Sequence, residues 1–239
     1  MTRAFREWKV LPHGKLTQID ENILTVVGEI HMPLMDLPRR MTVVRLSDSR
    51  LVVFSAIALD DDEMRQLEEF GRPAFLVVPS DKHRLDAKIW KDRYPSMQVV
   101  APEGARAGVE KVVPVDTTNP DLEDPNVQFV TVAGTREHEA ALVVRTPNGT
   151  TLVVNDVIGN MPQKSGLAGW LLHLTGFAGD HPRVPKLVKL SMIKDPDALR
   201  AQFEQWAGIE SLRNILVAHG SPIQERPRQT LGELASSLG

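Results

Sequence analysis

The sequence contains no cysteine among its 239 residues. This excludes disulfide bonds and thiolate metal ligands, so that a metal site would have to use His, Asp or Glu. The lack of cysteine fits a reducing compartment, and the first residues lack the apolar core of a signal peptide, so a cytoplasmic protein is expected. No apolar run reaches the length of about 18 to 20 residues that a membrane span needs, and membrane insertion is not expected.

An excess of positive charge is also lacking, because the formal net charge is -3 and aromatic residues make up only 5% of the chain. Without a basic stripe interleaved with aromatics, nucleic-acid binding is not expected. Glycine-rich phosphate loops, a dinucleotide fingerprint and a Gly-x-Ser-x-Gly elbow are missing, which disfavours kinases, dehydrogenases and serine hydrolases. A globular protein with a small-molecule substrate remains, and no feature of the sequence predicts its oligomeric state.

Short β-branched runs alternate with capped amphipathic segments along the chain. Strands are predicted at 23–27, 41–46, 51–54, 74–78, 98–101, 127–132, 141–144, 151–154 and 215–218. Helices are predicted at 60–71, 84–93, 195–207 and 230–238. This mixture of hairpins and helices predicts an α+β fold with two β-layers between helical layers, joined by a linker-like stretch at 113–126.

Polar clusters follow several of the predicted strands at the point where each strand ends. Ser80-Asp-Lys-His-Arg-Leu-Asp86 follows the run ending at Val78, Asn155-Asp156 follows the run ending at Val154, and His219-Gly220 follows the run ending at Ala218. Side chains at the carboxyl ends of buried strands gather at one rim of a sheet. The sequence therefore predicts a metal or acid/base site at such a rim.

The order of these clusters, with His138 between the first two, resembles the metallo-β-lactamase-like hydrolase superfamily over about residues 20–220. Three segments are also similar to a branch of that superfamily described only as a domain of unknown function: 40–46, 79–95 and 155–160. The resemblance implies a four-layer αββα sandwich, one domain over residues 1–239, and one or two metal ions at an edge of the sheets.

The superfamily's first motif is His-x-His-x-Asp-His. Aligning its second His with His83 places Asp81 at the first His, Leu85 at the Asp and Asp86 at the last His. The resemblance implies that His138, Asp156 and His219 are the later ligands. One ion would be held by Asp81, His83 and His138 and a second by Asp86 and His219, with Asp156 bridging them. Zn, Fe and Mn are the candidate metals, and the carboxylates favour Fe or Mn over Zn.

Leu85 departs from the motif at the position where the superfamily has an Asp that binds metal and orients the nucleophilic water, so a weak second site or none is expected. Asp156 or Asp81 is the candidate acceptor for the proton of that water. Simpler interpretations remain open: Asp81 as a helix N-cap, Asp86 as a first-turn charge, and His219 as a strand-end hydrogen-bonding group.

Two further alternatives concern neighbouring sequence. Glu139 is a rival ligand to His138 if the register shifts by one residue. The apolar, glycine-punctuated segment at 161–194 is interpreted as a lid over the site, as a helical insertion in the core or as a dimer contact.

Two hypotheses about function follow. The first is a metal-dependent hydrolase that acts on a small molecule through a metal-activated water. The second is a degenerate, non-catalytic member of the superfamily that serves as a binding or scaffold protein. The altered first motif is the feature that keeps the second hypothesis open.

Overall fold

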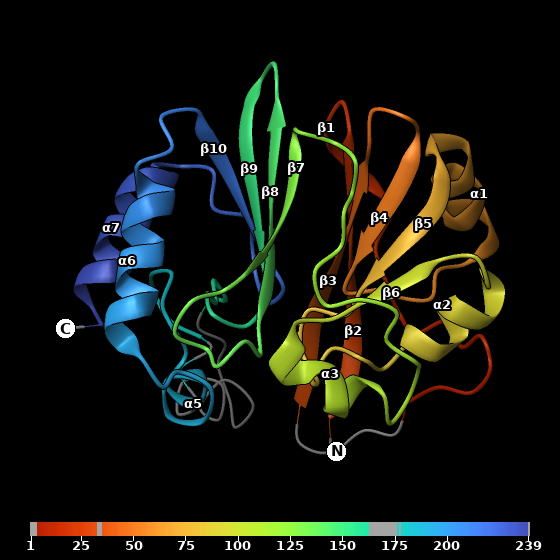
Figure 1. Ribbon diagram of the computed structural model, residues 1–239, viewed down its shortest axis with the longest axis horizontal. Coiled ribbons are helices and arrows are strands. Elements are labelled where there is room, and N and C mark those ends of the chain that lie inside the picture. The colour runs from red at the N-terminus through yellow and green to blue at the C-terminus, as the bar shows by residue number, and fades with distance from the viewer. Residues whose placement is uncertain (1–3, 33–34, 163–175, 177, 239) are drawn as a thin grey trace. The chain divides into compact units, whose positions relative to one another are not determined.

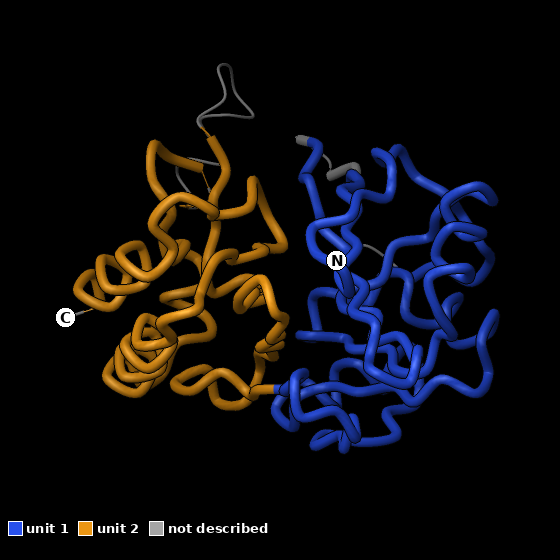
Figure 2. Tube along the Cα trace, turned by 90° about the horizontal axis from the view of Figure 1, so that it is seen from above, with its two compact units in different colours: residues 1–129 blue, residues 130–239 orange. Residues whose placement is uncertain are grey.

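The computed structural model describes residues 4–32, 35–162, 176 and 178–238. Its chain divides into two compact units, Met1–Phe129 and Val130–Gly239, which are coloured separately in Figure 2. Each unit contains one β-sheet with helices packed against it (Figure 1).

The first unit is built on a six-stranded sheet whose strands follow one another in sequence order. Its strands are β1 (Thr17–Asp20), β2 (Ile23–Met32), β3 (Met35–Arg45), β4 (Arg50–Phe54), β5 (Arg72–Val77) and β6 (Gln98–Val100). Its helices are α1 (Asp61–Phe70), α2 (Ala87–Arg93) and α3 (Glu103–Val109). Neighbouring strands from β1 to β4 are antiparallel, whereas β4, β5 and β6 are parallel, so these last three end at one edge.

The helices of the first unit cover one face of this sheet (Figure 1). Helix α1 begins because the Asp60 carboxylate accepts hydrogen bonds from the N–H groups of Asp62 and Glu63. Its residues Met64 and Leu67 are buried in the core below. Helix α2 contributes Trp90, which is fully buried and stacks at a tilt against Trp8 with 5.6 Å between ring centroids.

The second unit is built on a four-stranded sheet with the order β10-β9-β8-β7. Its strands are β7 (Val127–Thr131), which begins just before the division, β8 (Ala140–Thr146), β9 (Gly149–Val154) and β10 (Leu212–Val217). Its helices are α5 (Lys186–Ser191), α6 (Pro196–Ala207) and α7 (Pro227–Ser236). Strands β8 and β9 form an antiparallel hairpin, whereas β9 and β10 are parallel and end at the same edge.

Helices α6 and α7 lie together on one face of the second sheet (Figure 1). Their buried residues Phe203, Trp206 and Leu231 form one apolar cluster with Val154 and Ile215 of the sheet. Burying side chains of this size removes enough apolar surface from water to stabilise the packing of helices on sheet. The edge where β9 and β10 end is therefore held by a packed core.

The structure confirms the predicted strands and helices, with shifted ends. Helix α6 starts after its predicted cap, because the Asp195 carboxylate accepts a hydrogen bond from Ala198 N–H. Helix α2 starts at Ala87 instead of residue 84, and β2 extends to Met32. Residues 163–175 and 177 of the predicted lid or insertion at 161–194 lie outside the described residues, and the described part of that segment includes α5. Among the described residues, no helix has the length and apolar character of a membrane span.

Candidate functional site

His83 lies on the turn that follows β5, four residues before α2 begins at Ala87. The turn is closed by a hydrogen bond from His83 N–H to the Ser80 carbonyl (3.1 Å). The ring is held from the end of the parallel neighbour β4, because Ser55 Oγ lies 2.9 Å from His83 Nδ1. Two adjacent strand ends thus fix one imidazole.

Ser55 was not among the predicted site residues. It is buried and has a φ of 57°, a left-handed conformation that is unusual for a residue other than glycine. Its N–H donates to the carbonyl of Val77 on β5 (3.0 Å). The signal that would have found it is the same strand-end rule, because Ser55 directly follows the apolar run of β4.

Asp81 lies at the start of the same turn with its side chain 30% exposed. Its carboxylate is 3.3 Å from Lys82 Nζ. Its Cβ packs so closely on Gly108 of α3 that a Cβ atom added to Gly108 would lie 2.5 Å away. A role for Asp81 as metal ligand or proton acceptor stays a prediction.

Asp86 is fully buried and sits beneath the turn. One carboxylate oxygen, Oδ2, forms an ion pair with Arg39 of β3, and the other, Oδ1, accepts a hydrogen bond from Ala58 N–H (3.0 Å). Its neighbour Leu85 is also buried and apolar. Both oxygens of Asp86 therefore have donors supplied by the protein.

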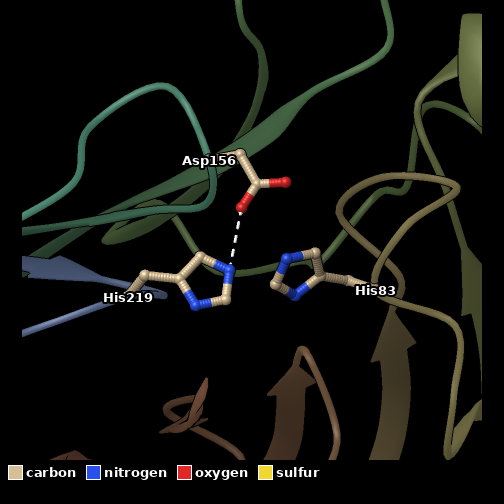
Figure 3. Close-up of side chains that lie close together, drawn as sticks. All are labelled: His83, Asp156 and His219. Atoms are coloured by element: carbon tan, nitrogen blue, oxygen red, sulfur yellow. Dashed lines mark ion pairs between the residues drawn. The ribbon is translucent and has the colours of Figure 1, made fainter. Parts of the chain in front are cut away.

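In the second unit, Asp156 follows β9 and His219 follows β10, and the two side chains meet. Asp156 Oδ1 lies 3.1 Å from His219 Nε2, the ion pair marked by the dashed line in Figure 3. Both residues are buried. The strand-end rule predicted this meeting, since the parallel strands β9 and β10 end at one edge.

The loops that carry this pair are joined by their backbones. Asn160 N–H donates to the His219 carbonyl (3.1 Å), Ser221 N–H donates to the Asn160 carbonyl (3.0 Å), and the Asn160 side chain donates to the Ser221 carbonyl (2.8 Å). These three bonds hold the residues after Asp156 against the residues around His219. The pair is thus fixed from both strands, and its geometry does not depend on the two side chains alone.

His138 lies on the turn between β7 and β8, with its N–H bonded to the Thr135 carbonyl (3.1 Å). Among the residues that the structure describes, no hydrogen bond or ion pair joins its ring to Asp156 or His219. The adjacent Glu139 is fully buried instead, and its Oε1 accepts a hydrogen bond from Asn155 Nδ2 (3.2 Å). Glu139 thereby contacts the residue that precedes Asp156, so both alternatives at this turn stay open.

Neither a protein-family model nor a curated protein matches the sequence. Solved structures do match the fold. A metallo-β-lactamase from Hirschia baltica is 9% identical, with a TM-score of 0.61 and with 94% of this chain and 98% of that chain covered. The metallo-β-lactamase FIM-1 from Pseudomonas aeruginosa, in its mono-zinc form, is 12% identical with a TM-score of 0.61, covering 96% of this chain and 97% of that one.

The metallo-β-lactamase DIM-1 is 10% identical to this chain, with a TM-score of 0.63. The match covers 97% of this chain and 100% of that one. At these identities the likeness concerns the fold. Because the matches span nearly the whole chain, they include both sheets and the loops that carry the strand-end clusters. The chain therefore has the α+β fold of these metallo-β-lactamases, which is the fold that its sequence predicts.

Proposed function

We propose that the protein is a metal-dependent hydrolase of a small molecule, in which Asp156, His219 and His83 bind one divalent ion. The observation that carries the proposal is the contact between Asp156 and His219. Metal ligands in a tetrahedral site lie about 2.0 to 2.2 Å from the ion, which places two ligand atoms about 3.3 Å apart. The 3.1 Å between Asp156 Oδ1 and His219 Nε2 fits such a pair.

The donor types also fit. Imidazole and carboxylate are ligands that Zn, Fe and Mn all accept, and a chain without thiolates offers no softer alternative. Both side chains are already buried and fixed by their loops, so little ordering would be needed on binding. Their arrangement at the ends of parallel strands is the support for a binding site, and the fold likeness is the support for its chemistry.

His83 joins this set in the proposal because the superfamily alignment places it at a ligand position and because its ring is held locally by Ser55. The hydrogen bond between its Nδ1 and Ser55 Oγ fixes the ring, as partners behind metal-binding imidazoles commonly do. With Nδ1 engaged, Nε2 is the nitrogen that would contact the ion. The alignment with the second His of the superfamily motif supports the same role.

A divalent ion bound there supplies a water nucleophile at neutral pH and polarises an oxygen of the substrate. The protein's own contribution is to supply the ligands that would hold the ion and a carboxylate that would accept the proton of the water. Asp156 would help to hold the ion, and Asp156 or Asp81 is the candidate acceptor for the proton of the attacking water. His138 or Glu139 would complete the ligand set from the turn before β8.

A second function, a non-catalytic binding or scaffold protein, is favoured by one observation. Leu85, which the alignment places at a ligand position, is buried and packs as an apolar side chain. Such a residue cannot ligate metal or orient a water. This alternative keeps the fold and the Asp156–His219 pair but predicts no turnover.

Thermal melting after metal removal tests the proposal. Protein treated with EDTA should melt at a higher temperature when Zn, Mn or Fe is added, because an ion bound only by the folded state adds about 2.7 kcal/mol of stability at a hundredfold excess over its Kd. The same preparation should contain metal by elemental analysis. His219→Ala and Asp156→Asn should each abolish the shift.

His181→Ala is the matched control, because His181 is exposed in the second unit. It should keep the full shift. A chain that takes up no metal, and whose melting responds to none, would contradict the proposal. A chain that binds metal but hydrolyses no ester, lactone, thioester or phosphoester in a substrate screen would support the non-catalytic alternative.

A further inference from the structure

Arg39 and Asp86 form an ion pair that is buried beside the apolar core of the first unit. Arg39 lies on the face of β3 that also carries Met41 and Val43, which belong to the apolar core under the helices. The side chain of Arg39 is 5% exposed and that of Asp86 is 0% exposed. Charges are rarely buried to this extent unless they are paired.

The carboxylate of Asp86 is engaged on both sides. The Arg39 guanidinium holds Oδ2, and Ala58 N–H holds Oδ1. An ion bound by Asp86 would have to displace one of these donors. It would also lie beside the fixed positive charge of Arg39, and two like charges in a poorly solvated interior repel strongly.

The residue before Asp86 also argues against a second metal ion. Leu85 is buried and supplies no ligand atom. The two consecutive residues that the superfamily alignment assigns to a second ion are therefore an apolar side chain and a carboxylate already neutralised by an internal cation. This part of the chain does not fit a metal.

We infer that the Arg39 guanidinium takes the place of a second metal ion as the positive partner of Asp86, so that the protein binds a single ion per chain. The inference rests on the proposed function for that one ion. Arg39 and Asp86 then act as positioning residues: the pair ties β3 to the residue that precedes α2, and so holds the turn that carries His83. Neither residue touches the ion.

The test is metal stoichiometry, measured by elemental analysis and by titration calorimetry with Zn or Mn. Wild-type protein should bind one equivalent. Asp86→Asn, which keeps an oxygen for Ala58 N–H, should still bind one equivalent, because Asp86 is not a ligand. Two equivalents in the wild type that fall to one in Asp86→Asn would overturn the inference while leaving the proposed metal dependence standing.

A second measurement is made on the metal-free protein and needs no ion. Arg39→Met and Asp86→Leu should each lower the melting temperature strongly, because each leaves one buried charge without its partner. The double variant Arg39→Met/Asp86→Leu should melt above both single variants, since it removes both charges together. If the losses in melting temperature of the two single variants simply add in the double variant, the pairing of Arg39 with Asp86 is overturned. Absence of metal from the wild type would instead overturn the proposed function.

Discussion

The carbonyl oxygen of Asn160 approaches Gly220 so closely that a Cβ atom on Gly220 would lie 2.0 Å from it. Gly220 also has a φ of 116°, in the region that favours glycine. The approach is what allows Ser221 N–H to bond to the Asn160 carbonyl. The residue after His219 is thus restricted to glycine by the same contact that joins the two loops.

Gly220→Ala should destabilise the protein by about 2 kcal/mol or more. The added methyl group would clash with the Asn160 carbonyl, and alanine would have to adopt a backbone conformation that is strained for it. It should also weaken metal binding, since the strain falls next to His219. Urea unfolding and metal titration measure the two effects.

Gly232→Ala provides the control for this substitution. Gly232 lies inside α7, where an added Cβ meets nothing within 4 Å, and alanine in a helix interior is favoured by up to about 1 kcal/mol. That variant should be at least as stable as the wild type. An equally stable Gly220→Ala would show that Asn160 and Gly220 are farther apart than described.

Ser55→Ala should lower metal affinity by roughly 10- to 100-fold, the usual effect of removing a hydrogen-bond partner from a metal-binding imidazole. The cause is the loss of the 2.9 Å contact with His83 Nδ1. Competition against a metal chelator of known affinity measures the change.

Ser55→Gly separates this effect from backbone strain. It removes the same hydroxyl but tolerates the φ of 57° at no steric cost. It should therefore be more stable to urea than Ser55→Ala and still bind metal weakly. Wild-type affinity in both variants would argue against a role for Ser55 behind His83.

Tyr94 is the only tyrosine of the chain, so absorbance at the phenolate band titrates this residue alone. Burial, together with the hydrogen bond that its hydroxyl donates to Glu68, raises its pKa to about 12. An unfolded tyrosine titrates near a pKa of about 10. The native midpoint should therefore lie well above the midpoint in denaturant.

The sign of the effect on stability follows from this difference. The folded state holds the proton more tightly, so the contribution of Tyr94 to stability is complete below about pH 10 and is lost as the pH rises toward 12. Glu68→Gln should lower the native midpoint, because it removes the charged acceptor. Equal midpoints in native and denatured protein would contradict the described environment.

Local sequence signals predicted much of the fold. Asp60 and Asp195 mark the starts of α1 and α6 because their caps act within three residues. Helix α3 was missed, since its seven residues include two glycines and no apolar periodicity long enough to detect. The prediction of one domain over residues 1–239 stays a prediction.

The candidate site was predictable where it depends on strand ends. Asp156 and His219 meet because parallel strands end together, which the order of apolar runs already indicates. The partner of Asp86 was not predictable, because Arg39 lies on a different strand and spacing carries no information about which buried charges pair. Ser55 was missed for a different reason: the strand-end rule covers it, but it was applied only where charged residues or histidines follow a strand.

The parallel pairing of β9 and β10 also has a consequence for the order of folding. Parallel neighbours need a long crossover, and here it spans the whole stretch between Val154 and Leu212, including α5 and α6. Closing so long a loop is slow, because the chain loses conformational entropy before the stabilising contacts between the two strands have formed. We therefore expect Asp156 and His219 to come together late in refolding, so that metal uptake by the proposed site would report the completion of the second sheet.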